Sequence, residues 1–162
     1  MSKEKNSRPL QESEYAALAE FRYQLRKFLR RMEEEVRHMG VNPQQYQLVL
    51  AVKGLPKDQV PTITCLAERM QLNHNSMVEL VDRCEEHNML RRTRSSTDRR
   101  QVTLALTPDG ENLLRRLGSA ARQELRSIGP MLVESVERLT EEKGLKIRDN
   151  KVRKELIKKV GS

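Results

Sequence analysis

Aromatic side chains are scarce in this chain of 162 residues, which contains three tyrosines, two phenylalanines and no tryptophan. Hydrophobic residues of all kinds make up only 36% of the sequence. A single subunit with long charged helices at both ends would therefore have little apolar material for a core. Because pairing with a second chain buries additional apolar surface without additional residues, the composition favours a homodimer.

Cysteine and long apolar runs are also rare. The chain has two cysteines, and none of its apolar runs approaches the roughly 18 residues that would suggest a membrane span. The first residues, Met-Ser-Lys-Glu-Lys-Asn, are polar and lack the apolar centre of a signal peptide. We therefore expect a protein of the reducing cytoplasm with no membrane partner.

The motifs of common enzymes and metal sites are missing from the sequence. There is no phosphate-binding glycine loop, no nucleophile elbow and no paired cysteine motif. Cys84 and His87 are three residues apart, but no tight cluster of cysteine and histidine accompanies them. The sequence predicts a protein that is not an enzyme, with no cofactor and no metal, in which Cys84 belongs to the core.

Positive charge is abundant. Lys and Arg number 31 against 23 Asp and Glu, which gives a formal net charge of +8. Five of the arginines lie between residues 91 and 100. An excess of positive charge favours a polyanionic partner, and its concentration in one short segment points to nucleic acid.

That arginine-rich segment has the pattern of a β-hairpin. Val102, Leu104 and Leu106 alternate with more polar residues, as in a half-buried strand. Residues 90–94 are a plausible antiparallel partner, which would place residues 98–100 at the tip of the hairpin. A threonine and a proline then begin a helix, because Thr107 suits the N-cap and Pro108 the first helical position.

Apolar residues at three- and four-residue steps predict six helices. The first has Ser13 as its N-cap and Gly40 as its terminating glycine. In the second, Leu50 is among the residues expected on the core side. Gly129-Pro130 is expected to break or kink the chain between the last two helices. The expected helices cover about residues 13–39, 43–53, 62–72, 74–87, 108–127 and 131–139.

These elements specify a fold class. The sequence predicts a mainly α protein with a small β-hairpin wing, in which a winged helix-turn-helix is flanked by N- and C-terminal helices that form a dimerisation region. The expected divisions are a flexible N-terminus (1–12), an N-terminal dimerisation helix (13–40), a winged helix-turn-helix DNA-binding region (41–107), C-terminal dimerisation helices (108–140) and a basic C-terminal tail (141–162).

Four short runs carry a family resemblance: Leu-Val-Asp-Arg at 80–83, Asn-Met-Leu-Arg-Arg at 88–92, Asp-Arg-Arg at 98–100 and Leu-Thr-Pro-Asp-Gly at 106–110. In this order they resemble the MarR family of transcription regulators, over about residues 13–140. The resemblance implies a homodimeric repressor. It also implies a small-molecule effector, often phenolic or anionic, that releases the protein from double-stranded DNA.

The predicted helix 74–87 is the candidate recognition helix, since the first turn of such a helix reads bases in the major groove. Asn75 suits adenine, and Val78 suits the methyl group of thymine. Glu79 would accept from cytosine or pair with an arginine such as Arg83. Asn88, where the family usually has glycine, still tolerates a left-handed conformation. The candidate DNA-binding residues of this helix are His74, Asn75, Ser76, Val78, Glu79 and Arg83; the alternative is that Asn73 and Ser76 only cap it.

The wing supplies a second set of candidates. Arg99 and Arg100 are expected to provide affinity, and the resemblance implies that Arg100 enters the minor groove, where arginine gains from the strong negative potential of narrow A·T tracts. Asp98 would then support its guanidinium through a bidentate pair. Arg94 and Arg92 are each expected to be either a phosphate contact or a structural residue. The alternative is a solvated charged turn.

The favoured function is repression from a pseudo-palindromic operator, with half-sites on the order of 10 base pairs apart. One alternative is a basic module that binds nucleic acid or acidic proteins without sequence preference. Another is an oxidant or metal sensor on the same scaffold. Cys65 is the candidate redox residue, because it lies in the first turn of a predicted helix and helix N-termini favour thiolates.

Overall fold

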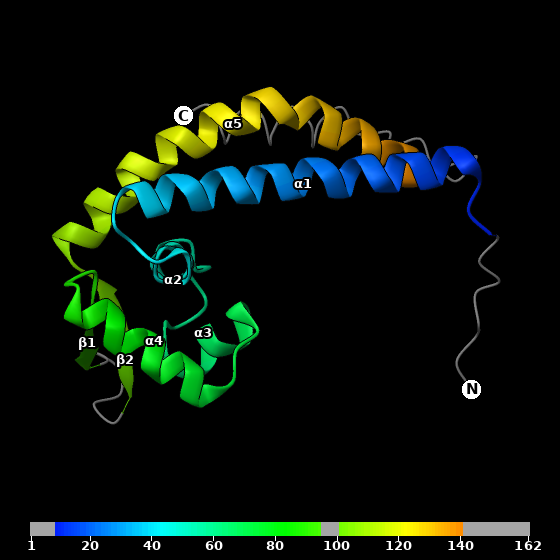
Figure 1. Ribbon diagram of the computed structural model, residues 1–162. Helices are drawn as coiled ribbons and strands as arrows, with labels where there is room; N and C mark the ends of the chain where they lie inside the picture. The colour runs from blue at the N-terminus through cyan, green and yellow to red at the C-terminus, as the bar shows by residue number, and fades with distance from the viewer. Residues whose placement is uncertain (1–8, 95–100, 141–162) are drawn as a thin grey trace, which may run out of the picture. The chain divides into compact units, whose positions relative to one another are not determined.

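The computed structural model describes residues 9–94 and 101–140. Its described part is mainly helical, with one antiparallel β-hairpin (Figure 1). This confirms the predicted fold class. The elements are α1 (Glu12–His38), α2 (Pro43–Lys53), α3 (Ile63–Met70), α4 (His74–Glu86), β1 (Leu90–Arg94), β2 (Val102–Leu106) and α5 (Pro108–Thr140).

The chain divides into two compact units. One unit is residues 28–125, which include α2, α3, α4 and the hairpin. The other consists of residues 1–27 with 126–162, of which 9–27 and 126–140 are described. Both boundaries fall inside long helices, so α1 and α5 each contribute to both units.

The core of the unit 28–125 lies where its three short helices meet the hairpin. Leu48 from α2, Leu66 from α3 and Leu80 from α4 are almost fully buried. Leu104 from β2 and Leu117 from α5 complete this cluster. Each large aliphatic side chain that is removed from water contributes about 1.5–3 kcal/mol before entropy is counted. The core therefore fixes the positions of α3, α4 and the hairpin together.

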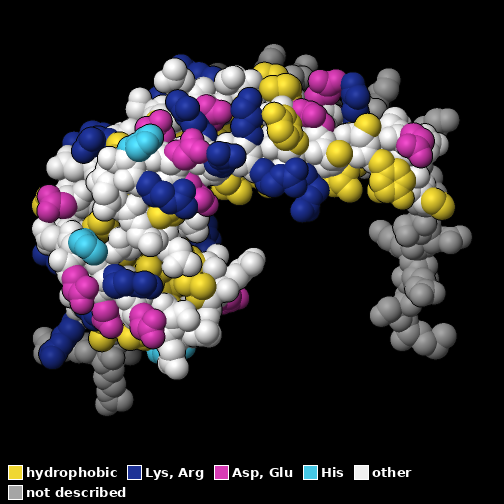
Figure 2. Space-filling model, viewed as in Figure 1, with side chains coloured by type: hydrophobic (Ala, Val, Ile, Leu, Met, Phe, Trp, Pro, Cys, Tyr) yellow, Lys and Arg dark blue, Asp and Glu magenta, His cyan; other side chains and the backbone are white. Residues whose placement is uncertain are grey.

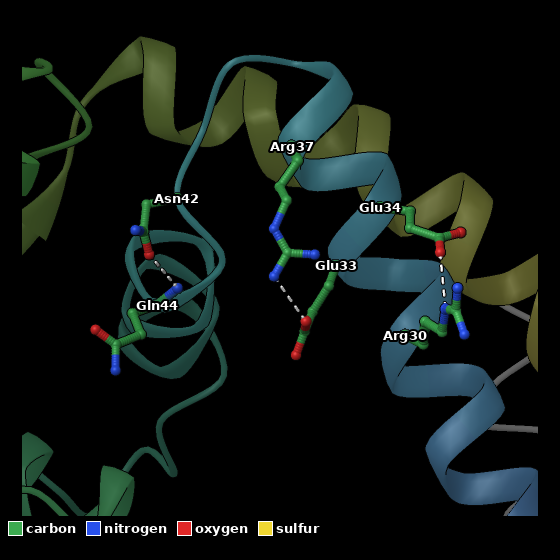
Figure 3. A network of polar contacts seen from close by, with 6 residues as sticks. All are labelled: Arg30, Glu33, Glu34, Arg37, Asn42 and Gln44. Carbon is green, nitrogen blue, oxygen red and sulfur yellow. Dashed lines mark hydrogen bonds and ion pairs between the residues drawn. The ribbon is translucent and has the colours of Figure 1, made fainter.

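The chain between α1 and α2 follows strong local signals. Gly40 has a φ of +73°, and the Val41 amide donates to the Val36 carbonyl at 3.2 Å, which closes α1 with a left-handed residue as predicted. Asn42 then caps α2, and its side-chain oxygen accepts from the Gln44 amide at 2.9 Å (Figure 3). The two caps are two residues apart, so the connection is short and defined.

Acidic and basic residues alternate on the solvent face of α1. Arg37 pairs with Glu33 at 2.9 Å, and Arg30 pairs with Glu34 at 3.0 Å, each at a spacing of four residues (Figure 3). Exposed pairs of this kind contribute only about 0.3–0.5 kcal/mol each. The acidic run at 33–35 is thus an ordinary charged helix surface.

Two local predictions, for the start of α1 and for the buried face of α2, were wrong. Helix α1 begins before Ser13, because the carboxylate of Glu14 accepts from the Gln11 amide at 2.7 Å and so caps the helix from inside its first turn. Leu50 is 47% exposed, while Gln45 on the same helix is buried. The amide of Gln45 donates to the Arg83 carbonyl at 3.0 Å, which turns that face of α2 inward instead.

The predicted break at Gly129-Pro130 does not occur, and α5 is continuous with Pro130 inside it. Proline removes a single backbone donor from the helix. Packing within the unit is retained on either side of it, since Ile128 and Ser135 are both buried. The Sδ atom of Met131 also accepts a hydrogen bond of 3.5 Å from the side-chain amide of Gln24 on α1. These contacts hold the helix together across the lost hydrogen bond.

The ends of α4, β1, β2 and α5 meet at one tightly packed junction. Asn88 has a φ of +53°, which confirms the left-handed residue expected after α4. The hydroxyl of Thr107 donates to the Asn88 carbonyl and accepts from the Gly110 amide at 3.1 Å, as predicted for an N-cap. Gly110 packs so closely on Met89 that an added Cβ would overlap the Met89 carbonyl oxygen. Glycine is therefore required at this position.

Gly110→Ala is expected to destabilise the protein by about 1–3 kcal/mol, the usual cost of forcing an extra carbon into a packed site. Gly118→Ala is the matched control on the same helix, because nothing lies within 4 Å of its would-be Cβ. That control should be stabilising by up to about 1 kcal/mol. Urea unfolding followed by circular dichroism measures both, and equal midpoints for the two variants would contradict the close packing at Gly110.

Candidate nucleic-acid interface

Helices α3 and α4 form a helix-turn-helix. Thr62 caps α3 by accepting from the Cys65 amide at 3.2 Å, and Asn73 caps α4 by accepting from the Ser76 amide at 2.8 Å. The turn between them depends on Gln71, which has a φ of +55°. This left-handed residue could not be predicted from the sequence, because glutamine carries no signal for that conformation. The turn closes when the Leu72 amide donates to the Ala67 carbonyl at 2.9 Å.

One face of α4 is buried and the other is open. Its apolar stripe, including Met77 and Leu80, lies in the core. Of the candidate reading residues, Ser76 and Val78 are half-buried. The exposed ones are His74, Asn75, Glu79 and Arg83. The predicted helical face is thus the surface that α4 presents to solvent.

The hairpin lies directly beside this helix-turn-helix. Its register pairs Leu90 with Leu106 and Arg94 with Val102. The amide of Leu104 donates to the carbonyl of Pro61 at 2.9 Å, so the segment before α3 is attached to the outer side of β2. This backbone hydrogen bond connects the wing to the helix-turn-helix, and it could not be predicted from the sequence.

Arg92 is bound within the protein. Its guanidinium pairs with Asp82 at 2.7 Å and with Glu85, and both carboxylates belong to α4. Burial is the largest influence on the pKa of Arg92 and lowers it, but the hydrogen bonds and negative charges of Asp82 and Glu85 outweigh burial and raise it. Of the two roles left open for Arg92, these contacts favour the structural one.

The remaining wing candidates fall into two groups. Arg94 is exposed at the end of β1, available to a ligand. Asp98, Arg99 and Arg100 lie outside the described residues. The suggested balance between Glu79 and Arg83 on α4 is not seen as an ion pair within residues 9–94 and 101–140.

The two cysteines differ in their surroundings. Cys65 is half-buried, and its Sγ lies 3.7 Å from Oε1 of Gln59. Cys84 is fully buried in the core, as predicted, and burial raises the pKa of its thiol to about 12. Since the ordinary value is 9.0, the fold's preference for the neutral thiol is fully present below pH 9 and is lost as the pH rises toward 12.

Thiol labelling at pH 8 should therefore modify one cysteine per native chain. We expect Cys65 to react with a disulfide reagent in the native state, while Cys84 reacts only when the chain unfolds. In Cys65→Ser the rapid phase should disappear. A rapid phase that survives this substitution would show that the core around Cys84 is open.

Within residues 9–94 and 101–140, no group of three or more histidine, cysteine, aspartate or glutamate side chains is arranged to hold a metal ion. Over the same residues, no helix combines the length and apolarity needed to cross a membrane.

Comparison with known proteins agrees with the fold and with the helix-turn-helix. A model described as the MarR family matches residues 39–101, which contain α2, α3, α4 and β1. Over these residues, which are less than half of the chain, the sequence is similar to the MarR family. The HTH-type transcriptional repressor MdtR of Bacillus subtilis (strain 168) is 31% identical over 80 residues, which are 49% of this chain and 50% of that protein. The match thus spans about half the length of this curated relative.

Solved MarR-type structures share the fold over nearly the full chain. A MarR family protein from Bacillus stearothermophilus has a TM-score of 0.62 at 19% identity, covering 95% of this chain and 100% of the other. The MepR–DNA complex of S. aureus has a TM-score of 0.55 at 16% identity, covering 94% and 98%. These similarities extend the shared fold to the long helices α1 and α5, which lie outside residues 39–101.

Proposed function

We propose that this chain is a cytoplasmic, sequence-specific DNA-binding transcription regulator of the MarR family, which represses from a pseudo-palindromic operator as a homodimer. The observation that carries the proposal is the exposed polar first turn of α4, held beside a cationic hairpin. The names of two relatives support it, since MdtR is called a transcriptional repressor and a MepR structure contains DNA. A non-enzymatic role fits the same features.

In this proposal α4 enters the major groove and reads base edges from its first turns. His74, Asn75 and Ser76 approach the bases first, and Val78 and Glu79 follow one turn later. The amide of Asn75 is suited to the donor and acceptor pair of adenine, and its exposure supports that role. Arg83 is then positioned for the phosphate backbone.

Affinity must come mainly from outside α4. This helix carries four acidic residues in its last two and a half turns, and acids beside phosphates oppose binding. We assign the electrostatic attraction to the wing, with Arg94 as a phosphate contact and with Arg99 and Arg100 as groove or phosphate contacts supported by Asp98. Helix α4 would thus select the sequence while the wing supplies much of the attraction.

The proposed homodimer is supported by the apolar surface of the unit formed by residues 9–27 and 126–140. Hydrophobic side chains gather on the surfaces of its two helices (Figure 2). Patches of exposed apolar side chains on a charged chain favour association. We propose that residues 13–40 and 108–140 form the dimer interface, while 41–107 bind DNA. The exposed residues are Tyr15, Leu18, Tyr23 and Leu25 on α1 and Met131, Val133 and Val136 on α5.

Release by a small molecule completes the proposal. A phenolic or anionic effector would act by binding more tightly to a dimer whose reading helices no longer match the operator spacing, because only unequal affinity for two states shifts their populations. The competing possibilities, a non-specific basic module or an oxidant sensor using Cys65, predict different binding behaviour.

The deciding experiment selects bound fragments from random double-stranded DNA and then measures the affinity of the selected and random duplexes at physiological salt. A specific regulator should prefer its selected site by roughly 10³-fold or more. Equal affinity for all duplexes would favour the non-specific module. If peroxide treatment abolishes DNA binding by the wild-type protein but not by Cys65→Ser, the oxidant sensor would be favoured.

Asn75→Ala should change base preference at one position per half-site and cost about 1–3 kcal/mol of discrimination there, with little change in the salt dependence of binding. Selection and fluorescence anisotropy on the variant measure both quantities. Gln47→Ala, an exposed amide on α2, is the matched control and should leave the preference intact. An unaltered selected sequence for Asn75→Ala would remove this residue from base reading.

Sedimentation equilibrium should give a mass twice the 18.9 kDa of one chain at micromolar concentration. Val133→Asp places a charge on the proposed interface and should shift the protein toward single chains, because a carboxylate in an apolar contact loses its hydration. Gln44→Asp, at an exposed position on α2, is the control and should remain dimeric. A wild-type mass of one chain would refute the dimer.

A further inference from the structure

Arg92 occupies an unusual place in the wing. Residues paired across a hairpin share a face, and Arg92 is paired with the buried Leu104. Two residues before it, Leu90 is almost fully buried on that same inner face. The side chain of Arg92 is 30% exposed, so its guanidinium is partly removed from water on the core side of the sheet, where charged partners offset the loss of hydration.

Those partners come from the recognition helix. Asp82 and Glu85 are three residues apart on α4 and therefore point to the same side of it. Nη2 of Arg92 lies 2.7 Å from Oδ1 of Asp82, and Nη1 contacts Oε2 of Glu85. The other oxygen of Glu85 accepts from the backbone amide of Arg92 at 2.6 Å.

Glu85 therefore binds both the side chain and the backbone of a single wing residue. A contact to the backbone fixes the position of β1 itself, whereas a contact to a side-chain end alone leaves the strand free to shift. The fork of the guanidinium adds a directional constraint, because its donors lie in one plane and reach two carboxylates at once. The three groups form a clamp between α4 and the root of the wing.

The clamp also changes the electrostatics of the reading surface. Two of the four acidic side chains on α4 are engaged by Arg92, which reduces their repulsion of phosphates. The same pairing occupies both terminal nitrogens of the Arg92 guanidinium. Of the arginines on β1, Arg92 is thus occupied, while Arg91 and Arg94 are exposed.

We propose that Arg92 is a positioning residue for DNA binding: clamped by Asp82 and Glu85, it holds the wing in a fixed orientation relative to the recognition helix and does not itself bind phosphate. This inference rests on the proposed DNA-binding function. Its physical basis is preorganisation, because two contact elements that are fixed before binding lose less freedom when they engage two grooves together.

Arg91 provides a matched control. It neighbours Arg92 on the same strand, pairs with Ala105 on the opposite face and is exposed, with no ion pair among the described residues. Arg91→Gln and Arg92→Gln remove the same charge from nearly the same place. Any difference between the two variants therefore reports the clamp.

The first measurement uses the full-length protein without DNA. Hydrogen exchange of the β1 and β2 amides should accelerate about tenfold in Arg92→Gln and remain at the wild-type rate in Arg91→Gln. Glu85→Gln should resemble Arg92→Gln. Wild-type exchange in Arg92→Gln would show that the ion pairs do not hold the wing and would overturn the proposal.

The second measurement is the salt dependence of affinity for the selected duplex. In Arg92→Gln we expect affinity to fall roughly three- to tenfold with the slope of log K against log salt unchanged, since no phosphate contact is lost. A slope smaller by about 1.8 units per dimer, or about 0.9 for each subunit, would mean that Arg92 neutralises phosphate and would overturn the proposal.

Arg92→Lys tests geometry separately from charge. Lysine keeps the charge but lacks the planar fork, so its affinity should stay near that of Arg92→Gln. Full recovery by lysine would show that charge alone matters and would refute a positioning role. If the wild-type protein shows no sequence preference, the proposed function fails, and the exchange comparison still decides whether the clamp fixes the wing.

Discussion

The close approach of Gly110 to the Met89 carbonyl is the contact on which the arrangement of this molecule depends. Helices α4 and α5 and strands β1 and β2 each end or begin within a few residues of this contact. The Thr107 hydroxyl donates to the Asn88 carbonyl on one side of it and accepts from the Gly110 amide on the other. The Thr107 amide also donates to the Met89 carbonyl at 3.2 Å, and the Asn88 side chain donates to Asp109 at 2.7 Å. Because these bonds link the end of α4 to the start of α5, the hairpin between them leaves the core at a defined place.

The wing is thus constrained at its root from two directions. On one side the junction holds the first residue of β1 and the last of β2, and on the other the Leu104 amide is bonded to the segment before α3. Side-chain contacts add to this, since Thr93 and Thr103 hydroxyls lie 2.9 Å apart across the strands. A two-stranded hairpin is marginal by itself in water. Attachment to neighbouring elements is what gives this one the fixed direction that binding in two grooves would require.

Much of this arrangement could be predicted from residues with strong local preferences. Gly40, Asn73, Thr107 and Asn88 each act where their chemistry suggested, so the end of α1, the starts of α4 and α5 and the presence of the hairpin followed from the sequence. The misses have a common cause. Tertiary packing overrides the apolar character of Leu50 and the helix-breaking preference of Pro130. It also holds Gln71 in a left-handed conformation for which glutamine carries no local signal. Likewise, in the sequence Arg92 is one of several arginines in a basic cluster. Its ion pairs with Asp82 and Glu85 become evident only when β1 is seen to pack beside α4.

The net charge of +8 does not show how charge is distributed over the described residues. That distribution distinguishes general attraction to a polyanion from discrimination between sequences. Helix α4 is acidic toward its C-terminal end and polar in its first turn, so it is poorly suited to non-specific attraction and well suited to discrimination. A basic surface spread evenly over the molecule would bind any duplex, and its affinity would fall steeply with salt without gaining selectivity. In the proposed complex, carboxylates beside the bound DNA would weaken every duplex alike. Only the duplexes that form the correct base contacts then recover the lost affinity, and this favours a sequence-reading role over a merely basic one.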